Sequence, residues 1–250
     1  MSESDGAAPA PWRNLYGRRH GKKLKPNQRR LLDELLPALA VPGVPAAGGS
    51  GGGRLDPAAL FAGRPREVWL EIGFGGGEHL VAQAEANPEV GLIGCEPFVN
   101  GVAMALRRIE EAGVPNVRLH PGDARDLIEI LAPGSLGRVF LLYPDPWPKA
   151  RHHRRRFMNP ENLALLAPAM REGAVLRVAT DIPDYADHAR EAGAAAPGFR
   201  ETTADPLRPW ADWPGTRYEA KALAAGRTPQ YLTFVREADE SPAAHACAAT

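Results

Sequence analysis

The stretch VWLEIGFGGG, from Val68 to Gly77, decides the fold class of this chain. It begins as a short apolar strand, and its glycines allow a sharp turn and a close approach of the backbone to a ligand. A dinucleotide fingerprint starting at Gly73 needs glycine at position 78, where the chain has Glu78. Because Glu71 and Glu78 flank the turn and would repel a pyrophosphate, a cationic ligand suits it better. A plain tight turn is the alternative interpretation.

Apolar segments alternate with segments of helical periodicity through the body of the chain. The expected strands are Val68–Gly73, Gly91–Glu96, Val117–His120, Arg138–Tyr143, Ala174–Thr180 and Gln230–Arg236. The expected helices between them are Gly77–Asn87, Pro97–Gly113, Asp126–Leu131, Pro160–Met170 and Asp184–Ala194. This alternation predicts an α/β fold with a mostly parallel sheet covered by helices on both faces. Ligands of such sheets bind beyond the carboxyl ends of the strands.

The chain divides into three parts of different character. They are a basic N-terminal arm with a short helix and a Gly/Pro linker (1–57), a folded domain (58–236), and a polar tail (237–250) that we expect to be disordered. The helix of the arm should run from Pro26 or Asn27 to Leu36, with Asn27 as its cap and Pro37 ending it. The linker, residues 41–53, is expected to have little order.

Composition excludes several classes of protein. The 250 residues carry 30 Lys+Arg and 30 Asp+Glu, so the net charge is zero. No apolar run is long enough to span a membrane, and the acidic start of the chain is unlike a secretory signal. Two cysteines, Cys95 and Cys247, cannot form a disulfide framework. We therefore expect a cytoplasmic protein without a membrane partner, as a monomer or a weak homodimer.

Basic residues are concentrated in two places despite this neutral balance. Eight of them, with no acid among them, lie between Arg13 and Arg30, and five lie between Lys149 and Arg156. A polyanionic partner bound at one face would explain both stretches. For the first stretch, a solvated charge run is an open alternative.

Acidic residues also follow the second and third expected strands. Glu96 is placed to accept both hydroxyls of a ribose, although it could instead cap the next helix. Asp123 can accept from an adenine amino group while the Ala124 N–H donates to the ring, and a turn or helix cap is the alternative for this Asp. Together with the glycine turn at Gly73 and Gly75, these positions favour S-adenosylmethionine over NAD as the ligand.

A proline-rich turn follows the fourth expected strand. In YPDPWPK, Tyr143 to Lys149, three prolines restrict the backbone around Asp145 and hold a carboxylate, an indole and an ammonium at a fixed spacing. Trp147 can stack on a flat base, which contributes about 1–3 kcal/mol. The run that follows can bind phosphates and consists of Arg151, His152, His153, Arg154, Arg155 and Arg156. Adjacent histidines among arginines make a poor cation site, so we expect no metal.

These motifs resemble those of the bacterial tRNA (guanine-N7-)-methyltransferases, and the resemblance covers about Val68 to Val235. The matching elements are EIGFGGG from Glu71, the strand-end Glu96, Asp123, YPDPWPKARHHRRR from Tyr143, Thr180-Asp181 with Tyr185-Ala186, and Thr216-Arg217-Tyr218-Glu219. The basic segment 17–25 is similar to the family's N-terminal arm. A departure is Tyr143, where many members have Phe.

The resemblance implies the class I, Rossmann-like methyltransferase fold with a mostly parallel seven-stranded sheet. It implies contacts with S-adenosylmethionine at Glu71, Glu96, Asp123 and Asp145. It further implies a site for the target guanosine at Lys149, Asp181, Thr216, Arg217, Tyr218 and Glu219. The run from Arg151 to Arg156 is expected to contact tRNA.

The expected reaction is methyl transfer to N7 of a guanosine in the tRNA variable loop, position 46 by tRNA convention. N7 has a free lone pair at neutral pH, so alignment with the methyl group is the main task. Asp145 is the candidate catalytic residue, because its carboxylate would stabilise the positive charge that develops on the ring. Asp181 and Glu219 are candidates for accepting guanine N1–H and N2–H, and Lys149 for donating to O6 or a phosphate.

Two alternatives remain open at this stage. Asp145-Pro146-Trp147 loosely resembles the Asp/Asn-Pro-Pro-aromatic motif of methyltransferases that act on exocyclic amines, although this chain lacks one of the two prolines. The chain could also be an RNA-binding protein that keeps the fold without catalysis. Identification of the methylated atom and a cofactor-binding assay separate these alternatives from N7 methylation.

Overall fold

The computed structural model describes residues 15–45 and 54–238, and these contain one seven-stranded sheet. The strands are β1 (Glu67–Ile72), β2 (Val90–Cys95), β3 (Val117–His120), β4 (Leu136–Leu142), β5 (Met170–Thr180), β6 (Phe199–Glu201) and β7 (Gln230–Arg236). Their order is β3-β2-β1-β4-β5-β7-β6, and β7 runs antiparallel to both of its neighbours while the other pairs are parallel. The predicted mostly parallel sheet is confirmed.

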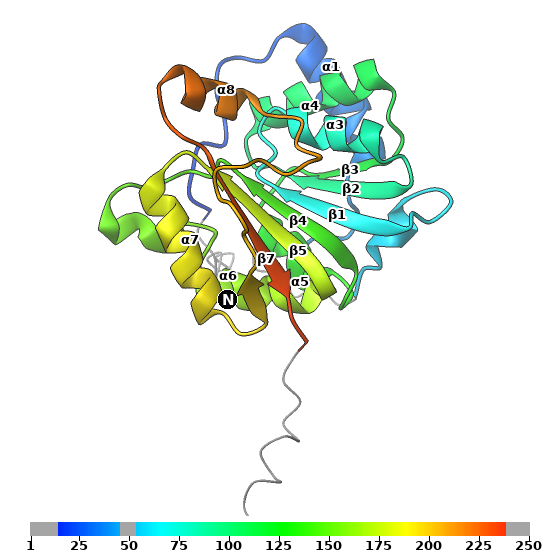
Figure 1. Ribbon diagram of the computed structural model, residues 1–250. Helices are drawn as coiled ribbons and strands as arrows, with labels where there is room; N and C mark the ends of the chain where they lie inside the picture. The colour runs from blue at the N-terminus through cyan, green and yellow to red at the C-terminus, as the bar shows by residue number, and fades with distance from the viewer. Residues whose placement is uncertain (1–14, 46–53, 239–250) are drawn as a thin grey trace, which may run out of the picture.

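Helices cover both faces of this sheet (Figure 1). The α-helices are α1 (Pro26–Glu34), α2 (Leu36–Leu39), α3 (Glu78–Ala86), α4 (Val99–Ala112), α5 (Ala124–Ile130), α6 (Pro160–Leu166), α7 (Pro183–Ala195) and α8 (Arg217–Ala224). Three 3₁₀ turns are η1 (Pro57–Leu60), η2 (Ala150–Arg155) and η3 (Ala167–Ala169). One buried apolar cluster joins α5, α6 and α7 to the sheet, and a second joins α1, α3 and α4 to the other face. Each fully buried Leu, Ile or Val in them contributes about 1.5–3 kcal/mol.

The arm departs from the sequence prediction at both ends of its helix. The N-cap residue of α1 is Lys25 and not Asn27. The backbone N–H of Lys25 donates to Gln28 Oε1 at 2.9 Å. Pro37 does not end the helix but lies inside α2. Val41, expected in a linker with little order, is buried and donates its N–H to the Leu119 carbonyl at 2.9 Å. Residues 46–53 of that linker and 239–250 of the expected tail lie outside the described residues.

The short strand β6 and the helix α8 are among the elements that were not predicted from the sequence. Strand β6 has three residues and only Phe199 is buried, so it shows no alternating pattern. Helix α8 is short, but a capping signal marks its start, because Thr216 is followed three residues later by Glu219. Thr216 Oγ1 accepts the Glu219 backbone N–H at 3.1 Å, as this signal requires.

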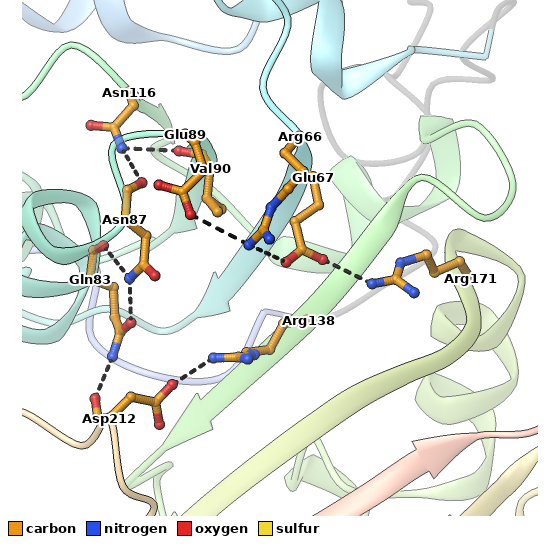
Figure 2. A network of polar contacts seen from close by, with 10 residues as sticks. All are labelled: Arg66, Glu67, Gln83, Asn87, Glu89, Val90, Asn116, Arg138, Arg171 and Asp212. Atoms are coloured by element: carbon orange, nitrogen blue, oxygen red, sulfur yellow. Dashed lines mark hydrogen bonds and ion pairs between the residues drawn. The ribbon is translucent and has the colours of Figure 1, made fainter.

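A polar network fixes the segment that leads into α8 (Figure 2). Figure 2 shows Asp212 accepting from Arg138 of β4, at 2.8 Å, and its carbonyl accepting from Gln83 of α3, at 3.0 Å. Asp212 also accepts from Arg177 of β5 at 2.6 Å. The loop before α8 is thereby tied to two strands and one helix. This attachment sets where Thr216 to Glu219 lie relative to the strand ends.

Candidate active site

A cavity of about 460 Å³ opens at the carboxyl ends of β1, β2 and β4, within the size range of small-molecule sites. Its walls come from the arm, the glycine turn, the segments after β2 and β4, and the start of α8. The lining residues are Tyr16, Gly17, Arg18, Ile72, Gly73, Gly75, Glu96, Pro97, Phe98, Leu141, Leu142, Tyr143, Pro144, Asp145, Trp147, Arg155, Phe157, Arg217 and Tyr218. Figure 1 shows the blue arm and the orange α8 at the same end of the sheet.

The glycine turn after β1 forms the floor of the cavity. Gly73 and Gly75 have φ angles of 73° and 58°, in the left-handed region that glycine tolerates best. A methyl group on Gly101 of α4 would lie 2.4 Å from the Gly75 carbonyl oxygen, so the turn packs directly on that helix. This close packing fixes the position of the turn, whose residues Gly73 and Gly75 line the cavity.

Glu96 lines the cavity with a carboxylate whose two oxygens both accept hydrogen bonds from the backbone. Oε2 accepts the Gly75 N–H at 2.7 Å, and Oε1 accepts the Phe98 N–H at 2.9 Å. Burial raises the pKa of Glu96 above its ordinary 4.5, while these bonds act in the opposite direction. Phe98 is the N-cap residue of α4, so Glu96 supports the helix start as well as lining the cavity. Each oxygen keeps lone-pair capacity for a ligand hydroxyl.

Two of the four acids that the resemblance assigns to the cofactor are not among the residues that line this cavity. Side chains alternate along β1, so Glu71 points toward α3, where its Oε2 lies 2.8 Å from Nδ1 of buried His79. Asp123 caps α5 by accepting the Arg125 backbone N–H at 3.0 Å, and it also pairs with the Arg125 guanidinium at 2.5 Å. Ala124 is buried at the first position of α5 and does not line the cavity. Asp123 therefore does cap a helix, and its contact with the cofactor stays a prediction.

Asp145 lies in the cavity wall on the strained segment after β4. Its side chain is exposed, and the neighbouring Tyr143 and Trp147 have φ angles of 48° and 43° although neither is glycine. A methyl group on Gly17 would lie 3.8 Å from Asp145 Oδ2, which places the arm directly beside this carboxylate. Such strain at a functional turn persists only where the surrounding structure enforces it.

The expected guanosine residues separate into two groups. Arg217 and Tyr218 line the cavity beside the glycine turn, where Nη2 of Arg217 lies 3.6 Å from a methyl position on Gly75. Thr216 and Glu219 lie behind them, since Thr216 caps α8.

The remaining guanosine candidates are engaged with other side chains. Glu219 accepts from Trp213 Nε1 at 2.9 Å and from the Tyr231 hydroxyl. Asp181 pairs with Arg227 Nε at 2.5 Å. The pKa of the Tyr143 hydroxyl is raised mainly by burial. Tyr231 and the negative charges of Glu219 and Asp181 raise it further. Both carboxylates therefore lie next to the cavity without facing it openly, while Lys149 is exposed.

The basic residues from Arg151 to Arg156 differ in how far their side chains are exposed. Arg151 and Arg154 are exposed on η2, and His152 and His153 are partly exposed. The pKa of His152 lies below its usual value, through desolvation and the neighbouring positive charges. Arg155 turns inward, with its guanidinium 4.5 Å from the Tyr16 ring and 4.9 Å from the Trp147 ring.

Arg156 does not match its expected role as an RNA contact. The residue is 1 % exposed, and its Nε donates to the Pro146 carbonyl at 2.9 Å. Its Nη2 pairs with the Asp184 carboxylate, and its Nη1 lies 3.4 Å from the Asp184 carbonyl. The neighbouring arginines are exposed or partly exposed because η2 lies on the surface, whereas the chain turns into the core at Arg156.

The arm is attached to α4 by backbone and side-chain hydrogen bonds that no local sequence pattern predicts. Asn100 Oδ1 accepts the Gly21 N–H at 2.7 Å, and Asn100 Nδ2 donates to the Lys22 carbonyl at 2.8 Å. The Val99 N–H donates to the Arg19 carbonyl at 3.0 Å. These bonds hold Tyr16 to Arg18 against the cavity, while the lysines and arginines that follow remain exposed.

Neither a metal site nor a membrane span is found where the structure can be described. Across residues 15–45 and 54–238, no group of three or more His, Cys, Asp or Glu side chains is arranged to hold a metal ion. No helix in the same residues is long and apolar enough to cross a membrane.

Comparison with known proteins places these features in one family. Residues 65–231 match the family model Methyltransf_4, described as "Putative methyltransferase". A tRNA (guanine-N(7)-)-methyltransferase of Ruegeria sp. (strain TM1040) is 57% identical over 92% of this chain and 91% of that protein. A protein of the same name from Ruegeria pomeroyi is 58% identical over 90% of this chain and 95% of that protein.

Comparison with solved structures concerns the fold. The crystal structure of the 16S rRNA methyltransferase KamB superposes with a TM-score of 0.53 at 20% identity, covering 70% of this chain and 89% of that chain. This likeness confirms the class I methyltransferase fold. At that identity it carries nothing about the substrate.

Proposed function

The chain belongs to the tRNA (guanine-N7-)-methyltransferase family, and we propose that it transfers a methyl group from S-adenosylmethionine to N7 of guanine in the variable loop of tRNA. The product is 7-methylguanosine. The observation that carries the proposal is one cavity that brings together the glycine turn, Glu96, Asp145 and the first residues of α8. The cytoplasm, where tRNA is found, is the proposed location.

The residues of the cavity fit S-adenosylmethionine, which carries a nucleoside, a sulfonium methyl group and an amino acid end. Glu96 would accept the ribose hydroxyls, and the backbone at Gly73 and Gly75 allows a close approach. Arg217 also lines the cavity, with its Nε 3.8 Å from Glu78 and its Nη2 donating to the Tyr218 hydroxyl at 3.2 Å. Such a guanidinium in the cavity wall suits a ligand carboxylate. When bound, the cofactor supplies the methyl group as an electrophile.

Asp145 has the position to act on the reacting atoms. The guanine N7 lone pair needs no general base, so correct alignment provides most of the rate, up to about 7–11 kcal/mol. The N7-methylated ring is cationic, and a carboxylate fixed beside it lowers the energy of the developing charge. Asp145 supplies that carboxylate at the cavity wall.

Guanine selection is assigned to the acids beside Tyr143. We place guanine N1–H and N2–H opposite Asp181 and Glu219, which the hydrogen bonds from Arg227, Trp213 and Tyr231 hold next to the cavity. A guanine that binds there must share or replace some of these donors. Adenine carries no N1–H donor, so an arrangement of acceptors discriminates against it.

The tRNA backbone is assigned to the exposed basic side chains around the cavity. These side chains are Lys149, Arg151 and Arg154 at η2, and Arg18, Arg19, Lys22, Lys23 and Lys25 in the arm. Phosphate contacts of this kind position the RNA and leave base recognition to the pocket.

The test is methylation of an unmodified tRNA transcript with labelled S-adenosylmethionine, followed by identification of the product nucleoside. We expect 7-methylguanosine confined to the variable loop. Methylation of an exocyclic amine would overturn the guanosine assignments while keeping the cofactor site. Cofactor binding without transfer to any tRNA would overturn the proposed activity.

A further inference from the structure

Among the described residues, Arg156 has the largest of the fully buried side chains, and it carries a charge. Its guanidinium donates to the Pro146 carbonyl at 2.9 Å and to both the carbonyl and the carboxylate of Asp184. Its guanidinium also lies 5.2 Å from the centre of the Tyr185 ring. A buried charge persists only with such partners, and the planar fork of arginine suits several acceptors at once.

One of these acceptors lies in the middle of the segment that carries Asp145. Pro144, Pro146 and Pro148 have no N–H, so the segment has few donors with which to stabilise its own conformation. The Tyr143 N–H donates to the Ala179 carbonyl at 2.7 Å where the segment begins. The bond from Arg156 to Pro146 holds the carbonyl of the residue that directly follows Asp145.

The other partner of Arg156 connects this segment to the RNA-facing run. Asp184 lies in the first turn of α7 with its side chain 62 % exposed. The same carboxylate lies 3.7 Å from Nε2 of His153 on η2. The hydrogen bond and charge of Arg156 lower the pKa of Asp184, so the carboxylate stays ionised at neutral pH.

We propose that Arg156 is a positioning residue for Asp145, because its guanidinium bridges the Pro146 carbonyl to Asp184 and fixes the turn that presents the catalytic carboxylate. This role rests on the proposed methyl transfer. It differs from the RNA contact that the sequence suggests for this position. A positioning role affects the rate of the bound complex, whereas an RNA contact affects the affinity for tRNA.

The decisive variant is Arg156→Lys, which keeps the charge but lacks the fork that reaches both acceptors. We expect kcat to fall on the order of tenfold or more, because small misplacement of a catalytic group is costly. The KM values for tRNA and S-adenosylmethionine, and the dependence of tRNA affinity on salt, should remain those of the wild type. The exposed neighbour Arg154→Ala should show the opposite pattern, with a raised KM for tRNA and a reduced salt dependence.

Arg190→Lys is the matched control. Arg190, on α7, is a partly buried arginine that contacts Asp187 at 3.3 Å and Gln230 at 3.2 Å, away from the turn. This control should keep the wild-type kcat. If Arg156→Lys does not fold, Asp184→Asn decides, since its exposed side chain tolerates substitution, and a lowered kcat with unchanged KM supports the proposal.

Two results would overturn the positioning role. One is an unchanged kcat in folded Arg156→Lys, or in Asp184→Asn where that variant decides. The other is a loss in Arg156→Lys confined to the KM for tRNA, which would make the residue an RNA contact. Wild-type protein that forms no 7-methylguanosine would instead refute the proposed function itself, so the two failures are distinguishable.

Discussion

The backbone of Gly17 passes beside the carboxylate of Asp145, so that a methyl group on Gly17 would lie 3.8 Å from Oδ2. A residue of the N-terminal arm thus lies against the candidate catalytic group, 128 positions later in the chain. The arm forms part of the cavity wall as well as carrying basic residues for RNA. Its attachment should therefore influence methyl transfer directly.

We expect Gly17→Ala to lower kcat/KM on the order of tenfold, because φ of 125° is strained for alanine by about 1–3 kcal/mol and the arm would move to relieve it. Gly63→Ala is the control, since Gly63 also has a positive φ, of 75°, with no atom near its methyl position. That variant should lose some thermal stability and keep its methylation rate. Equal rates for both variants would mean that the arm does not contribute to the site.

Asn100→Ala should release the arm from α4, because it removes the bonds to Gly21 and Lys22, each contributing about 0.5–1.5 kcal/mol. We expect faster tryptic cleavage in residues 18–25 and a raised KM for S-adenosylmethionine. Asn27→Ala removes an exposed bond to Arg30 and should change neither. An arm equally resistant to trypsin in Asn100→Ala would contradict this attachment.

Asp145→Ala should lower kcat by about 10²–10³, the usual effect of losing one group that stabilises developing charge. Single-turnover methylation at saturating tRNA and cofactor measures this step without binding effects. Asp187→Ala, at an exposed position of α7, is the matched control with wild-type turnover expected. Near-normal turnover in Asp145→Ala would remove this carboxylate from the mechanism.

Cofactor binding should weaken as the pH falls through the raised pKa of Glu96. Burial is the main cause of that raised pKa, so the folded protein binds a proton here more readily than the unfolded chain, and this group favours folding at lower pH. The ligand responds with the opposite sign, because an ionised carboxylate accepts hydrogen bonds more strongly. Calorimetry should show the Kd rising toward acid pH in the wild type. Glu96→Gln should bind more weakly at neutral pH and lose this part of the pH dependence.

Affinity for tRNA should fall steeply with salt if the basic side chains contact the backbone. About six phosphate contacts predict a loss on the order of a thousandfold between 50 and 200 mM salt. Arg151→Ala should reduce the slope of log affinity against log salt by about 1. A flat salt response of the wild type would contradict the RNA-binding surface.

Local patterns predicted most of the fold because they depend on neighbouring residues. Each apolar strand and its following turn could be identified from a few positions, and Glu96 and Asp145 do line the cavity at the strand ends. The direction of Glu71 follows from the alternation of side chains along β1, a pattern that is already present in the sequence. Helix α8 could likewise have been found from its capping signal at Thr216 and Glu219.

The sequence by itself determined the alternation of apolar strands and helices, the glycine turn and the proline-bound Asp145, because these follow from periodicity and backbone restriction within short segments. Only the tertiary structure decided that the arm attaches through Asn100, 79 residues from Gly21, and that Arg156 is buried beside exposed Arg154. Adjacent arginines are alike in sequence, but their roles depend on where the folded chain turns into the core. That turn depends on packing among α7, η2 and the segment after β4, which are distant in the chain.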